Sequence, residues 1–387
     1  MKKPSADKLI TCGILSAALA GLTALFLHRE YSFTAVLSSI KTADPLWLIP
    51  GILAMGLFFV CEGANIGRCL RLAGHSVSRS SEIRYAMAGF FFSSITPSAS
   101  GGQPMQLYFM YKDCLPLSHS SLALLTELTS FQAAAAALAL AGLVASCSRV
   151  PGLPPGTAAA CGGGAAGGGA AGGGAAADAT ASMAVSSAHA ATEAATTAGD
   201  TITTAILAAG ILISAAVLAV LLFIIFSPSA SRIIASPVLW AVDRLNPQNA
   251  PVLKIRFLRS ICEYRHASRY ITKNPGTMAR IFFTSVIQLL AYFSITFCVC
   301  KSLGISGISW IHITLCQAAL YAAVSALPLP GAVGVTEGGF AVIFASLIPS
   351  ELMGVAIILS RFVSFALPLV ASGIGTLLLG GMPEHDS

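Results

Sequence analysis

Charged residues are scarce in this sequence. Of its 387 residues, 22 are Lys or Arg and 16 are Asp or Glu, 10% together, while 55% are hydrophobic. A typical soluble domain carries about 25% charged residues, so an ordinary soluble protein is excluded. The few charges leave six long windows empty, at residues 9–27, 46–61, 85–111, 201–231, 281–300 and 302–336. Because about 20 consecutive apolar residues cross a bilayer as a helix, these windows predict an all-α integral membrane protein.

Signatures of soluble enzymes are absent as well. The sequence has no phosphate-binding P-loop, no G-x-S-x-G elbow and no H-E-x-x-H pair. Its ten cysteines include no C-x-x-C pair, so the spacing typical of metal and redox sites is missing, and we interpret the cysteines as small buried hydrophobic residues. We expect no metal, cofactor or catalytic residue. We also expect no nucleic-acid binding, because the basic residues behind the net charge of +6 lie in loops between apolar windows.

Two clusters of proline and glycine interrupt the apolar windows. Pro97 to Gly101 and Pro330 to Gly334 have the same spacing, and each follows a short apolar segment. A helix broken inside a membrane frees backbone polar groups, which is tolerated only in a protein interior or beside a polar cavity. The clusters therefore predict two re-entrant helical hairpins, at residues 85–112 and 310–347. The other windows predict six full spans, at residues 9–27, 46–63, 118–145, 201–226, 280–300 and 352–379.

The two halves of the chain resemble each other. Glu127 follows Pro97 by 30 residues, and Arg361 follows Pro330 by 31. A chance match between apolar sequences is the alternative. A true repeat would divide the chain into membrane repeats at residues 1–147 and 201–381, separated by a low-complexity, disordered external loop at 148–200. Three crossings per half is an odd number, so the second repeat would be inverted, a plan common among secondary transporters.

Lys and Arg predict the orientation of the chain. They gather at residues 68–84 and 228–280 and at the N-terminus, whereas residues 28–45 and 148–200 contain few of them. Cytoplasmic loops carry an excess of Lys and Arg. We therefore expect both basic loops and both termini to be cytoplasmic, with the first apolar window an uncleaved span rather than a signal peptide.

Four ionisable residues interrupt the membrane segments: Glu62, Glu127, Glu337 and Arg361. A charge at the centre of a bilayer costs about 2.5–3.5 kcal/mol on insertion scales, so each must face protein, water or a partner. One interpretation is a ligand site. The other is structural ion pairing, of Arg361 with Glu337 or Glu127, while Glu62 snorkels or pairs with Arg68.

The hairpin tips suggest a second kind of chemistry. Helix N-termini there would present unpaired N–H groups and a partial positive charge to a phosphate, and Arg361 could add charge-assisted hydrogen bonds. The alternative is that the glycines only permit tight turning and close packing. The candidate substrate-binding residues are Pro97, Gly101, Gly102, Gln103, Glu127, Pro330, Gly334, Thr336, Glu337 and Arg361.

The sequence resembles the lysylphosphatidylglycerol synthase transmembrane family, also called the flippase-like domain family. The resemblance rests on four features in the same order: the tip at residues 90–104, Glu127, the tip at residues 327–337 and Arg361. The resemblance implies a bacterial cytoplasmic membrane protein that translocates a phospholipid, such as lysyl-phosphatidylglycerol, and supports resistance to cationic antimicrobial peptides. Gln103 and Pro104 depart from the family pattern, which usually offers Arg or Glu there.

Full-length members of this family add a cytosolic domain that transfers lysine from lysyl-tRNA to phosphatidylglycerol. No such domain follows residue 381 in this sequence, so we expect no lysyl transfer by this chain alone. Two alternatives stay open at this point: a phosphatidylglycerol lysyltransferase, and a membrane anchor for a separate cytosolic synthase.

Overall fold

The computed structural model describes residues 43–96, 100–147, 214–225, 273–325, 335–345 and 347–379, with a few more residues between 212 and 265. Predictions for the first span and for the loop at 148–200 lie outside the described residues, as do Pro97, Pro330 and Gly334. Every regular element that the structure describes is helical, which confirms the all-α class.

Four segments are long and apolar enough to cross a membrane: Pro45–Leu72, Leu117–Gly142, Pro275–Ser302 and Ser350–Thr376. They confirm the spans predicted at 46–63, 118–145, 280–300 and 352–379. From the span predicted at 201–226, the structure describes a shorter apolar helix, Ser214–Ile225.

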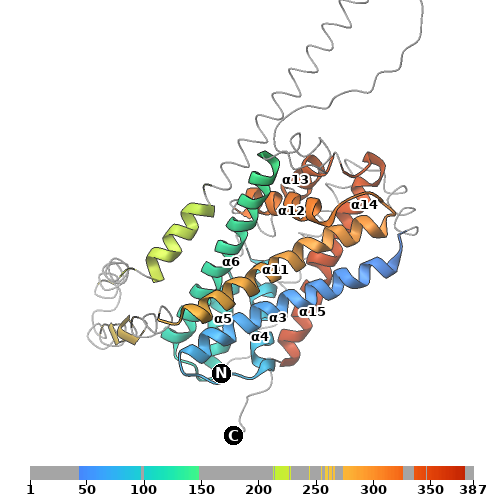
Figure 1. Ribbon diagram of the computed structural model, residues 1–387. Helices are drawn as coiled ribbons and strands as arrows, with labels where there is room; N and C mark the ends of the chain where they lie inside the picture. The colour runs from blue at the N-terminus through green and yellow to red at the C-terminus, as the bar shows by residue number, and fades with distance from the viewer. Residues whose placement is uncertain are drawn as a thin grey trace, which may run out of the picture.

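Long helices form the frame of the molecule (Figure 1). They are α3 (Leu48–Leu72), α6 (Leu117–Cys147), α11 (Pro275–Ser302), α14 (Ser350–Arg361) and α15 (Leu367–Leu379). A π-helical turn, Phe362–Ala366, joins α14 to α15. On α3 the apolar residues Ile49, Leu53, Leu57 and Val60 are exposed. Their spacing of three or four residues places them on one helix face, as expected of a surface that meets lipid.

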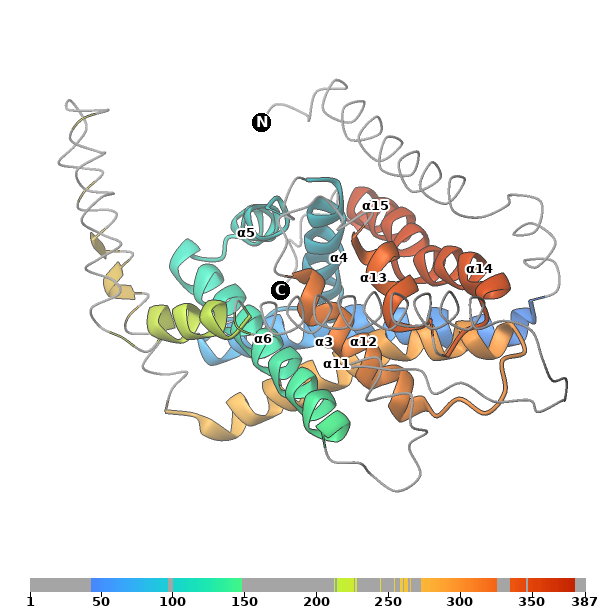
Figure 2. The same ribbon diagram turned by 90° about the horizontal axis from the view of Figure 1, so that it is seen from above.

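Helices α3 and α11 lie side by side in both views (Figure 1, Figure 2). The amide of Asp44, just before α3, donates to the carbonyl of Ser302 at the end of α11 (2.8 Å). Further along, Phe58 meets Tyr292, and Asn65 donates to the hydroxyl of Ser285 (3.1 Å). The residue numbers of these contacts rise along α3 and fall along α11, so the two helices are antiparallel.

Both predicted hairpins are present as pairs of short helices. The first consists of α4 (Arg79–Ile95) and α5 (Gly102–Lys112), and the second of α12 (Trp310–Ser325) and α13 (Val335–Ile343). Gly102 lets the first pair approach closely, since a Cβ there would overlap the Ser93 hydroxyl and lie 2.7 Å from the carbonyl oxygen of Gly89. The depth of the tips in a membrane stays a prediction.

The hairpins pack across the two halves of the chain. Helix α4 of the first hairpin packs against α15, the last helix of the second half, and α12 of the second hairpin packs against α6, the last helix of the first half. Each half therefore presents the same order of elements, a long helix, a helix pair and a long helix, and each helix pair packs against helices of both halves.

We predict that close packing of α3 on α4 tolerates no side chain at Gly63. A Cβ there would lie 2.7 Å from the backbone carbonyl oxygen of Glu82, whereas a Cβ at Gly56 on the same helix meets nothing within 4 Å. Overpacking typically costs about 1–3 kcal/mol. Gly63→Leu should therefore lower the midpoint of thermal unfolding in detergent, and Gly56→Leu should leave it unchanged. Equal midpoints would contradict the close packing.

Candidate functional site

Glu337 and Arg361 form a buried ion pair. Arg361 Nε donates to Glu337 Oε1 over 2.8 Å, and the two side chains are 18% and 0% exposed. Glu337 lies in the first turn of α13, where the helix dipole favours a negative charge. Of the two carboxylates predicted as partners of Arg361, the structure therefore selects Glu337.

The backbone at Arg361 is unusual. Arg361 ends α14, and the π-helical turn begins at the next residue. Such turns are rare and occur frequently at functional sites. The guanidinium also lies 5.8 Å from the ring centre of Phe365 within that turn, a cation–π contact that orients it.

A second polar group lies around the first hairpin. Gln106 of α5 is almost fully buried, and its Nε2 donates to Glu62 Oε1 (3.1 Å) and to the backbone oxygen of Tyr85 (3.2 Å). One prediction paired Glu62 with Arg68. In the structure the partner of Glu62 is Gln106 instead. Six residues correspond to about 600° of helix rotation at 3.6 residues per turn, so Glu62 and Arg68 leave α3 on different faces. Gln106 was not among the predicted site residues.

Glu127 faces the same region from α6. Phe58 of α3 meets Phe131 of α6, and Glu62 and Glu127 lie one turn from these rings in antiparallel helices. Both carboxyl groups therefore lie at one level of the contact between α3 and α6, one turn beyond Phe58 and Phe131. Glu127 is 7% exposed, and among the described residues it has no hydrogen-bonding or charged partner. We call Glu62 and Glu127 the acidic pair.

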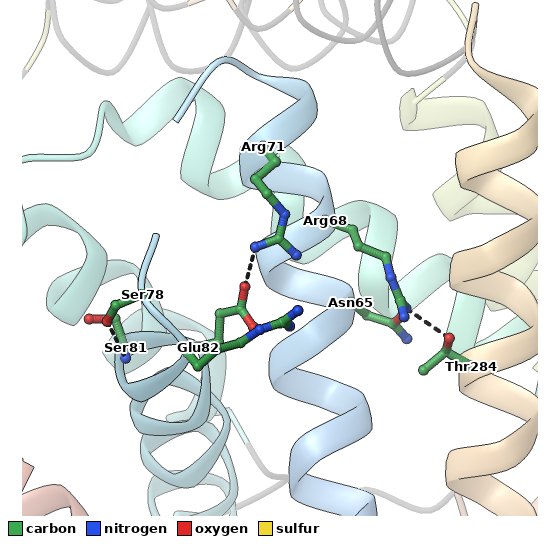
Figure 3. A network of polar contacts seen from close by, with 8 residues as sticks. Asn65, Arg68, Arg71, Ser78, Ser81, Glu82 and Thr284 are labelled. Carbon is green, nitrogen blue, oxygen red and sulfur yellow. Dashed lines mark hydrogen bonds and ion pairs between the residues drawn. The ribbon is translucent and has the colours of Figure 1, made fainter. Parts of the chain in front are cut away.

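A hydrogen-bonded network lies one turn from the acidic pair. Arg68 donates to Asn65 Oδ1 and to Thr284 Oγ1 of α11, each over 2.7 Å, and Figure 3 shows its side chain turned toward Thr284. Ser285 joins Asn65 to Ser130 of α6 (3.2 Å). This network ties α3, α6 and α11 together, so we interpret it as structural.

Glu82 forms the polar contact between α3 and α4. It is 2% exposed and pairs with Arg71 and with Arg79 (2.9 Å), and Figure 3 shows Arg71 reaching down to it. Ser78 caps α4 by accepting from the amide of Ser81 (3.2 Å). Because Arg71 lies at the end of α3 and Arg79 in the first turn of α4, these ion pairs of Glu82 hold the start of the first hairpin against the end of α3.

The first hairpin tip differs from the predicted phosphate site in one respect. The Gly101 amide donates to Thr96 Oγ1 (2.8 Å), so that N–H is already bound within the tip. Gly102 is buried, whereas Gln103 is exposed. In the second hairpin, Thr336 is partly buried beside Glu337. The structure thus brings Glu337 and Arg361 together, and it brings Glu127 to Glu62 rather than to Arg361.

These features describe a multi-pass helical membrane protein with polar groups buried between its spans. Residues 13–177 and 176–372 match the family described as "Lysylphosphatidylglycerol synthase TM region". The chain belongs to this family, as its motifs predicted. No curated protein sequence matches it.

We predict that Glu337 and Arg361 stabilise the fold as a pair. Removing one partner of a buried pair strands a charge and costs about 3–5 kcal/mol, whereas replacing both is far less costly. Glu337→Gln should therefore lower the thermal unfolding midpoint in detergent, and adding Arg361→Gln should restore most of it. Glu351→Gln, an exposed carboxylate on α14, is the control. A double variant no more stable than Glu337→Gln would contradict the pairing.

Proposed function

We propose that the chain moves a phospholipid, such as lysyl-phosphatidylglycerol, between the leaflets of the bacterial cytoplasmic membrane. The observation that carries the proposal is the buried pair of Glu337 and Arg361 at a broken helix, in a chain whose family is defined by a lipid synthase membrane region. Ionisable residues inside membrane segments commonly mark substrate pathways.

Arg361 would bind the lipid phosphate. A guanidinium presents its N–H donors as a planar fork, which matches the geometry of a phosphate. Glu337 would hold the guanidinium until the phosphate competes for it. Thr336 and Gly102 would lie close to the head group, and Gln103 would meet it at the exposed start of α5. Gly101, whose amide is bound to Thr96, would shape the tip rather than donate to the lipid.

An inverted repeat accounts for the way the halves pack. Exchange of α3 with α11, α4 with α12 and α6 with α15 maps the contact of α4 on α15 onto that of α12 on α6. Under this proposal, residues 1–147 and 201–381 are the two repeats, Pro97, Pro330 and Gly334 break their hairpins, and the substrate crosses between them.

The ends of the bundle support a cytoplasmic orientation for both basic loops and both termini. Arg71 and Arg79, at one end, precede the first hairpin. At the opposite end the tryptophans Trp47 and Trp310 are 41% and 40% exposed. Trp is enriched at membrane interfaces, and Lys and Arg at cytoplasmic ends.

The experiment is leaflet exchange in proteoliposomes that contain head-group-labelled phosphatidylglycerol or its lysyl ester, followed with an impermeant quencher. We expect exchange by the wild type. Glu337→Gln/Arg361→Gln should stay folded but exchange about 10–100-fold more slowly, because charge-assisted hydrogen bonds contribute about 1.5–3 kcal/mol. Arg259→Gln, an exposed arginine, should exchange as the wild type does.

Three results would contradict parts of this proposal. Undiminished exchange in the neutralised double variant would remove the pair from the pathway. A new lipid species in extracts from cells that express the chain, without exchange by the purified protein, would favour a transferase. Retention of a soluble partner, again without exchange, would favour a membrane anchor for a separate synthase.

A further inference from the structure

The acidic pair has no role in the phosphate site. Val363, two residues after Arg361, lies at Gly51 near the start of α3, whereas Glu62 is eleven residues further along. At 1.5 Å per residue, Glu62 lies about 16 Å further along the α3 axis than Gly51, the residue that Val363 contacts. The acidic pair is therefore a second buried polar centre, distinct from the pair of Glu337 and Arg361.

Two carboxylates at close quarters in a low-dielectric interior do not both ionise, because each charge disfavours the other and burial disfavours both. A basic partner would remove this penalty. Among the described residues none pairs with either carboxyl: Arg68 is bound to Asn65 and Thr284, and Arg361 to Glu337.

The surroundings of Glu62 offer its carboxyl group both a donor and a possible acceptor. Gln106 donates to Oε1 of Glu62, and a protonated carboxyl needs an acceptor for its own O–H. Gln288 of α11 supplies a candidate. It is 1% exposed, and its Oε1 has no hydrogen-bond partner among the described residues.

The helix register places Gln288 opposite Glu62. On α11 it lies between Ser285 and Tyr292, the residues that meet Asn65 and Phe58 of α3. On α3, Glu62 lies between Phe58 and Asn65. Both residues therefore lie at one level of the face that α3 and α11 share. The buried Oε1 of Gln288, which has no donor among the described residues, is thus opposite a carboxyl group that can donate when it is protonated.

We propose that Glu62 and Glu127 form a proton-binding site inside the membrane that holds a proton at neutral pH. Assuming the proposed function, binding and release of this proton drive lipid exchange. Glu62 is only partly buried, so its carboxyl group is not fully enclosed by the bundle. Titratable groups on neighbouring turns of the packed elements include Cys61, Arg68 and Cys69 of α3, Tyr85 of α4, Tyr292 of α11 and Tyr321 of α12.

Infrared spectroscopy of the purified protein tests the proton site without any lipid transport. At neutral pH the wild type should show the C=O band of a protonated carboxyl, shifted by exchange into D2O. Glu62→Gln/Glu127→Gln should lack this band, and Glu351→Gln should keep it. The other carboxylates buried in the described residues, Glu82 and Glu337, are paired with arginines and are present in both variants, so a band lost only in Glu62→Gln/Glu127→Gln does not come from them. No band in the wild type, or the same band in a folded double variant, overturns the proposal.

A pH gradient across the proteoliposomes tests the coupling. One proton per lipid makes a gradient of about one pH unit worth about tenfold in the leaflet ratio of the carried lipid. We expect this redistribution in the wild type and none in Glu62→Gln/Glu127→Gln. Wild-type exchange that ignores the gradient overturns the coupling. No exchange under any condition overturns the proposed function together with the coupling, while the infrared band still decides the proton site.

Discussion

The antiparallel contact between α3 and α11 is the constraint on which the other polar arrangements depend. A bilayer offers no water to backbone or side-chain polar groups, so each must be satisfied within the protein. Asn65, Arg68, Thr284 and Ser285 satisfy one another across this contact. Because the same contact fixes the register of the two helices, it also sets Glu62 level with Gln288 and leaves both hairpins to pack against a rigid pair.

Close packing at glycines is the second constraint on the structure. Here the glycines matter because they lack a side chain, not because their backbone is flexible. At Gly63 and Gly102 the neighbouring chain comes so near that a Cβ would lie 2.7 Å from a backbone oxygen. Van der Waals packing between helices drives association in membranes, where apolar side chains gain little by leaving lipid. The first hairpin is thus held against α3 by close packing and by the buried Glu82, and its polar residues are placed accurately as a result.

The sequence predicted four of the spans and the positions of the two helix pairs, because apolar length and Pro/Gly breaks are local signals. It left Arg361 with two candidate partners, since the choice between Glu337 and Glu127 depends on how α13 and α6 pack. It missed Gln106 altogether: a lone glutamine in a short helix carries no signal until its neighbours are known. The spacing of Glu62 and Arg68 by six residues was itself informative, because it places them on different faces of α3. The depth of the hairpins and the role of Glu127 were not decided by sequence or fold.

An aromatic layer separates the two buried polar centres. Its neighbouring ring centres lie 5.3–6.3 Å apart, and its members are Phe58, Phe59, Phe90, Phe131, Tyr292, Phe293 and Tyr321. Rings from α3, α4, α6, α11 and α12 meet there, so both halves of the chain contribute. A charged head group passing from Arg361 to the acidic pair would have to displace these rings, and binding of one proton by the acidic pair changes the charge one turn from Phe58 and Phe131. If lipid crosses between the halves, its head group has to pass this layer, to which α3 and α11 of the frame both contribute rings.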